Sequence, residues 1–242
     1  MGKPFSICTV TMLCVWLLSG CLYPEDRLSG GMEALPRHVN EVQQAVDRYQ
    51  KEHRVLPIKT EEGDVPVYQK YPVDFGRLVP AYIGDAPPSS FEKGGPYMYV
   101  LIDVEEDPTV KLFDLRVTDR LRGIQQEINV YTVENDRYPR GMEIEPGVFE
   151  LNAELLEQAD VTVQSPYHPE TELPLVMSSD GTVYVDYRSD LIRMIETMDS
   201  PPPPETDIRY LLTEDSLFAP AHSLPYVYED GNVMFKPTAE NP

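Results

Sequence analysis

The chain has 242 residues, a formal net charge of −21 and a hydrophobic fraction of 41%. This length allows one or two domains, and the apolar content is sufficient for a folded core. Because 41 Asp and Glu stand against 20 Lys and Arg, the chain repels phosphate backbones, so nucleic acid is not expected as a partner. The 24 Pro residues restrict long helices to the few stretches that lack Pro.

The first 20 residues are predicted to be a signal peptide. Lys3 gives a short positive region, and residues 5–18 form an apolar run that is short for a transmembrane helix. The run ends in Leu18-Ser19-Gly20-Cys21, which resembles the lipobox of bacterial lipoproteins. The resemblance implies that the Cys21 thiol receives a diacylglyceryl group, that the peptide is cleaved before Cys21, and that the new amine becomes available for acylation, for example with palmitate. An ordinary secretory signal that contains Cys is the alternative.

Cysteine usage agrees with a lipid anchor. Cys8 and Cys14 lie in the segment that would be removed, so the mature chain would have no free thiol and no disulfide. Two or three acyl chains hold a protein durably on a bilayer. We therefore expect attachment to the extracytoplasmic face of the cell membrane through the lipid on Cys21, with residues 21–36 as the lipidated N-terminus and tether.

Two amphipathic helices are predicted from matching apolar patterns displaced by 82 residues. The patterns, each with spacings of 4, 3, 4 and 3, are Leu35, Val39, Val42, Val46 and Tyr49, and Val117, Leu121, Ile124, Ile128 and Tyr131. Five of the sixteen positions from Val42 to Pro57 are identical in the second pattern, including a Gln-Gln pair at 43–44 and 125–126. These identities favour an internal duplication over convergence of two unrelated helices.

Shorter elements follow each predicted helix. Asp74 and Asn152 are good N-cap residues for short helical turns. A strand is predicted at 96–102, and a hairpin at 173–185 around Asp180-Gly181. A further hairpin is predicted at 224–235 around Asp230-Gly231.

The predicted fold class is α+β: a tandem duplication of a helix plus a small antiparallel sheet, with a C-terminal hairpin. The predicted domains are two repeats at residues 37–118 and 119–200, a Pro linker at 201–204 and the hairpin segment at 205–242.

Short motifs accompany the predicted unit. A Tyr-Pro turn occurs at 134–139, and strand entries with Pro followed by Tyr occur at 91–99 and 220–228. These motifs loosely resemble the globular heads of type II secretion pseudopilins over residues 35–190. The resemblance implies a helix packed on a small sheet. It does not imply assembly into a fibre, because the chain lacks the processed N-terminal apolar helix through which pilins polymerise.

Longer segments carry a second resemblance, over nearly the whole mature chain. They are residues 18–25, 56–60, 68–72, 100–104, 109–112 and 184–191. In these segments the chain resembles the YphF-like lipoproteins of Gram-positive spore formers, an uncharacterised family. The resemblance implies membrane attachment on the outer face and no established activity.

No catalytic residue, cofactor site or metal site is predicted. The histidines His38, His53, His168 and His222 lack the spacing of a helical zinc motif. The chain also has no nucleophile elbow and no Gly-rich phosphate loop. The acidic clusters at 61–64 and 103–107 lack a calcium-loop signature, so we expect solvated surface there, with calcium binding as the alternative.

The candidate interaction surface consists of tyrosines. Tyr184, Tyr187, Tyr226 and Tyr228 alternate along predicted strands, so half should face the core and half are available to a partner.

A close basic trio on the second predicted helix is Arg116, Arg120 and Arg122. We expect it to form a solvated face balanced by Asp114 and Asp119. Direct binding to an anionic wall polymer is the alternative.

Three functions are compatible with these features. The leading expectation is a non-enzymatic, membrane-anchored envelope or structural module that binds a protein partner of the envelope. The first alternative is a solute-binding lipoprotein that serves an ABC transporter, with an unspecified small-molecule ligand. The second is a cell-wall hydrolase, which needs a positioned acid–base pair.

Overall fold

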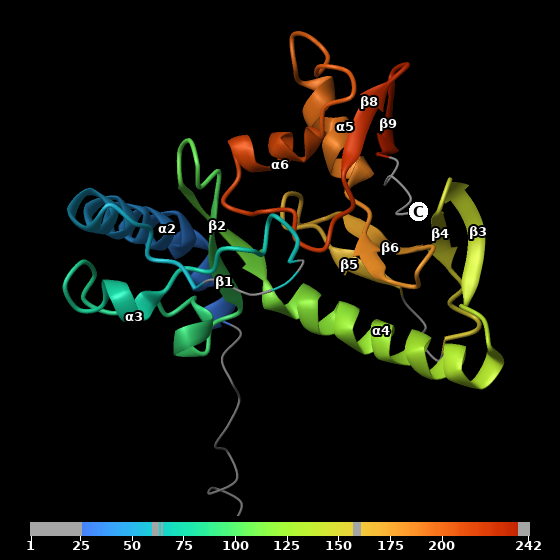
Figure 1. Cartoon of the computed structure of the whole chain (residues 1–242), viewed down its shortest axis with the longest axis horizontal. Coiled ribbons are helices and arrows are strands. Elements are labelled where there is room, and N and C mark those ends of the chain that lie inside the picture. The colour runs from blue at the N-terminus through green and yellow to red at the C-terminus, as the bar shows by residue number, and fades with distance from the viewer. Residues whose placement is uncertain (1–25, 60–62, 64, 157–160, 237–242) are drawn as a thin grey trace, which may run out of the picture. The chain divides into compact units, whose positions relative to one another are not determined.

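The computed structural model describes residues 26–236, except 60–62, 64 and 157–160 (Figure 1). The chain divides into two compact units, residues 1–35 and 36–242. Of the first unit, the structure describes the N-terminal part of helix α2 (Asp26–His53). The predicted signal peptide and Cys21 lie outside the described residues. Within the described ranges, no helix is long and apolar enough to cross a membrane.

The second unit begins with the rest of α2 and a two-stranded sheet. Its next elements are α3 (Phe75–Leu78), η1 (Phe91–Lys93), β1 (Tyr97–Ile102) and β2 (Thr109–Asp114). As predicted, Asp74 caps a short helix, because the Gly76 amide donates a hydrogen bond of 3.0 Å to Asp74 Oδ1. Strand β2, whose residues the sequence pattern does not assign, pairs antiparallel with β1.

A larger sheet follows the second long helix. The elements are α4 (Leu115–Asn135), β3 (Arg140–Glu145), β4 (Val148–Leu151), β5 (Thr162–Gln164), β6 (Glu172–Ser178) and β7 (Val183–Val185). The antiparallel strand order is β3-β4-β6-β5, and β7 also pairs with β6. A turn follows Asn152, as predicted, and in it the Glu154 amide donates to Asn152 Oδ1 at 3.2 Å.

The C-terminal part adds three short helical elements and a hairpin. They are α5 (Arg188–Glu196), η2 (Ile208–Tyr210), α6 (Leu211–Glu214), β8 (Tyr226–Glu229) and β9 (Asn232–Phe235). The predicted hairpin is confirmed, and its turn residues Asp230 and Gly231 have φ angles of 50° and 83°. Positive φ at both positions is what a two-residue hairpin turn requires. The fold class is α+β, as predicted.

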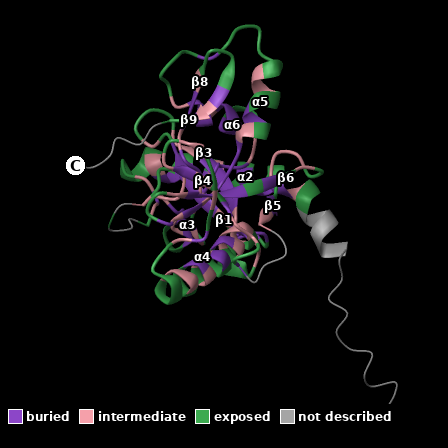
Figure 2. Cartoon of the chain, turned by 90° about the vertical axis from the view of Figure 1, so that its right-hand side faces the viewer, coloured by how far each residue is buried: buried purple, intermediate pink, exposed green. Residues whose placement is uncertain are grey.

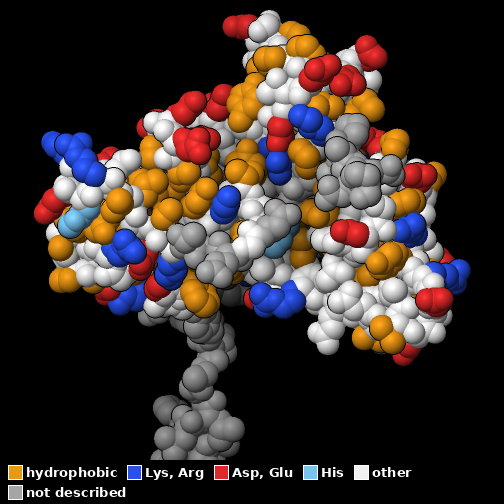
Figure 3. All heavy atoms as spheres, viewed as in Figure 1, with side chains coloured by type: hydrophobic (Ala, Val, Ile, Leu, Met, Phe, Trp, Pro, Cys, Tyr) orange, Lys and Arg blue, Asp and Glu red, His pale blue; other side chains and the backbone are white. Residues whose placement is uncertain are grey.

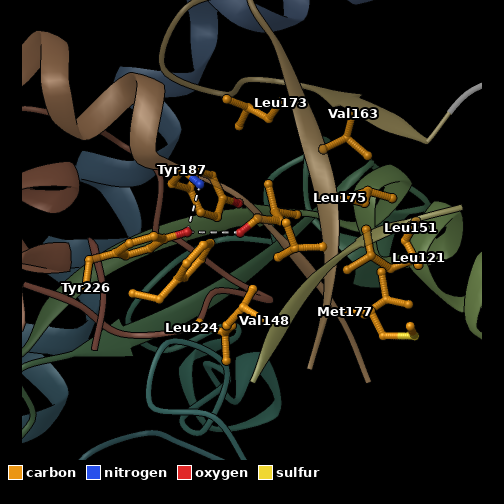
Figure 4. Packing of buried hydrophobic residues seen from close by; sticks show 14 of the residues in the cluster. Leu121, Val148, Leu151, Val163, Leu173, Leu175, Met177, Tyr187, Leu224 and Tyr226 are labelled. Atoms are coloured by element: carbon orange, nitrogen blue, oxygen red, sulfur yellow. Dashed lines mark hydrogen bonds between the residues drawn. The ribbon is translucent and has the colours of Figure 1, made fainter. Parts of the chain in front are cut away.

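The core around the larger sheet also receives the C-terminal hairpin (Figure 4). Ile124 and Ile128 of α4 are fully buried in the same cluster as Met177 of β6 and Phe235 of β9. Figure 2 shows buried residues along the strands and exposed residues at the outer turns of the helices. Burial of this apolar surface, at roughly 25 cal/mol per Å², is the main force that holds these elements together.

The same backbone pairings occur in the first and second halves of this unit. The recurring pairs are Ile58–Val73 and Pro72–Val100 in the first half, and Arg140–Leu151 and Glu150–Val176 in the second. In each half, the residue after a buried Pro thus pairs with the residue that precedes Asp74 or Asn152.

One glutamine on each long helix binds the second strand of its own hairpin. Gln43 Nε2 donates to the Pro108 carbonyl at 2.9 Å, and Gln43 Oε1 accepts from the Val110 amide at 2.7 Å. Gln125 binds the Gly181 carbonyl and the Val183 amide in the same way, at 2.9 and 3.0 Å. Both glutamines belong to the Gln-Gln pairs in the sequence, so the two helices use equivalent residues to hold their hairpins.

Candidate functional site

The tyrosines proposed as an interaction surface divide into two groups. Tyr187 and Tyr226 are 3% and 0% exposed, so they are the half that faces the core, and they are wrong as candidates for the interaction surface. The Tyr226 hydroxyl accepts a hydrogen bond from the Tyr187 amide at 2.8 Å and donates to the Val185 carbonyl at 3.2 Å (Figure 4). Tyr184 and Tyr228 are half-buried and pack against the same core. The four residues therefore do not form a continuous tyrosine surface.

Two of the four histidines interact with neighbouring hydroxyl groups. His38 Nδ1 lies 3.1 Å from Ser89 Oγ, and burial lowers the pKa of His38. His53 Nε2 lies 2.8 Å from the Tyr82 hydroxyl. Each histidine thus has a structural hydrogen-bond partner.

His222 lies beside a carboxylate but without room for a substrate. Its Nε2 is 2.8 Å from Thr118 Oγ1, and burial lowers the pKa of His222 to about 4. His222 and Asp114 line a cavity of about 10 Å³, which is the space of one water molecule. Asp114 already binds Arg116, through an Nε–Oδ1 hydrogen bond of 2.9 Å. This pair is therefore too enclosed to act on a polymer.

His168 belongs to a buried polar cluster between β5 and α5. Asp190 is fully buried and accepts a hydrogen bond from Ser165 Oγ at 2.8 Å. Burial raises the pKa of Asp190, while the hydrogen bond from Ser165 opposes this shift. Among the described residues, His168 Nε2 and Asp190 Oδ1 have no hydrogen-bond partner. Asp190 is therefore out of reach of a large substrate, whereas His168 is only half-buried.

The charged candidates lie at the surface. Arg116 pairs with Asp114, and Arg122 pairs with Asp119 at 2.8 Å, as expected for a balanced face. The acidic cluster at 61–64 lies largely outside the described residues, and the one at 103–107 forms a turn in which two amides bind the Asp103 carbonyl. In the described parts of the chain, no group of three or more His, Cys, Asp or Glu side chains is arranged to hold a metal ion.

A groove of about 490 Å³ runs along the outer side of α4. It is lined by Gly123, Gln126, Glu127, Val130, Tyr131, Glu134, Leu155 and Leu156. We call these eight residues the α4 groove.

The α4 groove exposes apolar side chains that a solvated helix face would not carry. Val130 is 52% exposed and Leu155 is 38% exposed, and Val133, which neighbours Val130 on the helix surface at a spacing of three residues, is 86% exposed. Hydrophobic side chains lie exposed among charged ones in the region of α4, at the lower right of Figure 3. Exposed apolar side chains with polar neighbours also occur at protein contact sites.

The sequence contained a signal for this groove that the helix pattern alone does not reveal. At a displacement of 82 residues, Val130 and Val133 correspond to Arg48 and Lys51 of α2. Both positions lie outside the apolar stripe, where charged residues are usual. Val130 and Val133 therefore depart from the pattern expected of a solvated helix face.

Comparison with models of protein families finds a similarity over residues 36–114. Neither the curated proteins nor the solved structures contain a match to this chain, so the likeness to pseudopilin heads stays a prediction. The matched range begins within α2 and ends with the last residue of β2, and thus contains the first glutamine-bound hairpin. Residues 36–114 are similar to the N-terminal domain of the YphF family.

Proposed function

We propose that this chain is a lipoprotein held on the extracytoplasmic face of the membrane through Cys21. Its folded part would bind a protein partner of the envelope through the α4 groove, without catalysing a reaction. The observation that carries this proposal is the exposed apolar surface of Val130, Val133 and Leu155 on an otherwise charged chain.

The anchor is supported by the lipobox-like residues Leu18-Ser19-Gly20-Cys21 at the end of an apolar run. The similarity of residues 36–114 to a YphF family domain agrees with the resemblance to YphF-like lipoproteins. We expect Cys21→Ala to remain unprocessed or to leave the membrane fraction. Unchanged membrane fractionation of that variant would contradict the anchor.

The binding role is supported by the size and chemistry of the groove. A volume of about 490 Å³ accommodates several side chains of a partner. The acidic Glu127 and Glu134 at the groove and the net charge of −21 favour neutral or basic partners over anionic wall polymers.

We also propose that the two halves, residues 37–118 and 119–200, arose by duplication. The recurring strand pairs and the equivalent hydrogen bonds of Gln43 and Gln125 support this origin.

The double variant Val130→Arg/Val133→Lys tests the binding role, because it gives α4 the residues that α2 carries at these positions. Tagged full-length chain would be purified from membranes, and its partner quantified. We expect recovery to fall at least tenfold in this variant and to stay unchanged in Met142→Lys, which alters a residue that is 69% exposed on β3. Equal recovery from both variants, or saturable binding of a small solute with no protein partner, would reject the proposal.

A further inference from the structure

The face of α2 that corresponds to the α4 groove is covered by a tyrosine of the same chain. Tyr82 follows α3 and packs edge-on against Tyr49, with ring centroids 5.3 Å apart. The Tyr82 hydroxyl donates a hydrogen bond of 2.6 Å to Glu52 Oε2. Arg48 also donates a hydrogen bond to the Tyr82 carbonyl. As a result, Tyr49 is 8% exposed.

The same receiving residues are present on α4. Tyr131 and Glu134 correspond to Tyr49 and Glu52 at the displacement of 82 residues, and both line the α4 groove. The base of the groove also corresponds, because Leu156 and Leu78 are both buried. Tyr131, in contrast to Tyr49, remains half-buried. Glu134 is exposed and has no hydrogen bond or ion pair within the described part of the chain.

The second half of the sequence does not supply the covering tyrosine. Residues 79–82 are Val-Pro-Ala-Tyr, whereas the corresponding residues 157–160, at a displacement of 78, are Glu-Gln-Ala-Asp. Only the Ala is shared, and Asp160 stands where Tyr82 stands in the first half. An Asp cannot provide an aromatic ring.

We propose that the α4 groove receives a tyrosine side chain of the partner protein. Its ring would pack against Tyr131 and its hydroxyl would donate a hydrogen bond to Glu134, as Tyr82 does with Tyr49 and Glu52. Val130 and Val133 replace the charged residues of α2 and extend the contact to apolar atoms beside the tyrosine. This inference rests on the proposed protein-binding function and names the chemistry of the partner.

A peptide with the sequence around Tyr82 serves as the probe for tyrosine binding in the α4 groove. A fluorescent, amidated peptide of residues 78–84, Leu-Val-Pro-Ala-Tyr-Ile-Gly, would be titrated with full-length chain in detergent, and its anisotropy measured. We expect saturable binding with a Kd of about 0.5 mM, as is reasonable for one anchoring side chain. Replacing the peptide tyrosine with phenylalanine should weaken binding about tenfold, because the hydrogen bond to a carboxylate is lost.

Variants of the chain locate the site. Glu134→Gln should weaken the tyrosine peptide several-fold and reduce the difference between the tyrosine and phenylalanine peptides, because a neutral amide oxygen accepts a weaker hydrogen bond than a carboxylate does. Val130→Arg/Val133→Lys should weaken both peptides, and Met142→Lys should change neither. Circular dichroism would verify that each variant is folded.

Any of three results with the peptides would overturn the inference. They are absence of saturable binding, equal affinity for the two peptides, and binding that is insensitive to Glu134→Gln. A dimeric chain that becomes monomeric in the double variant would also overturn it, by assigning the groove to a second copy. If the membrane partner still depends on Val130 and Val133 while the peptide does not bind, the binding function stands and only the tyrosine is rejected.

Discussion

Replacing either helix glutamine with alanine should destabilise the fold by a similar amount. Gln125→Ala removes two hydrogen bonds to the β7 hairpin and leaves the amide of the buried Val183 without this partner. Each bond contributes about 1 kcal/mol, and the loss exceeds the gain of roughly 0.4 kcal/mol in helix propensity. Gln43→Ala removes the equivalent bonds to Pro108 and Val110. We therefore expect a loss of about 2 kcal/mol for each variant.

The adjacent glutamines provide matched controls. Gln44 and Gln126 are the exposed members of the same Gln-Gln pairs. Their replacement by alanine should change the free energy of unfolding by less than about 0.5 kcal/mol.

Urea unfolding followed by circular dichroism measures these differences. With an m-value of about 2 kcal/mol per M, a loss of 2 kcal/mol lowers the midpoint by about 1 M. The reasoning is refuted if Gln43→Ala and Gln125→Ala behave like their controls. A large effect in only one half would refute the claim that the two glutamines have equivalent roles.

Two further predictions concern buried charge. Arg188→Ala should lower the free energy of unfolding in urea by about 3 kcal/mol, because it removes the ion-pair partner of the buried Asp186. Arg193→Ala on the same helix is the control, and equal effects of the two variants would contradict the prediction. His222→Asn should flatten the pH dependence of stability. Burial lowers the pKa of His222 from 6.5 to about 4, so the free energy of unfolding of the native sequence falls by about 3 kcal/mol as the pH falls from 6.5 to 4. Asn also tolerates the positive φ of 55° at this position. An unchanged pH profile in this variant would contradict the role of His222 in the pH dependence.

The long helices and two of the hairpins could be predicted because their signals are local. Apolar residues at spacings of 3 and 4 define the buried faces of α2 and α4, and Asp-Gly pairs mark the turns at 180–181 and 230–231. The β3–β4 hairpin was missed, since β3 is largely exposed and its pairing contains register shifts. Such a strand has no clear alternation of polar and apolar residues.

The candidate site was harder to predict than the fold. Alternation along a strand indicates that half the tyrosines face inward, but not which face the C-terminal hairpin will cover. Tyr226 is buried because β8 packs into the core of the larger sheet. The sequence signal for the α4 groove is a difference between corresponding positions of the two helices: α2 has Arg48 and Lys51 where α4 has Val130 and Val133. A single helix examined by itself does not display that difference.

Site-specific photo-crosslinking in living cells tests the central claim, that the anchored chain meets a protein through the α4 groove. A photoreactive benzoylphenylalanine would replace Val133, which neighbours Val130 on α4, or, as control, Met142 on β3; both positions are exposed. The account predicts a crosslink to one envelope protein from position 133 and none from position 142. Absence of a product at 133, or the same product from both positions, would contradict it.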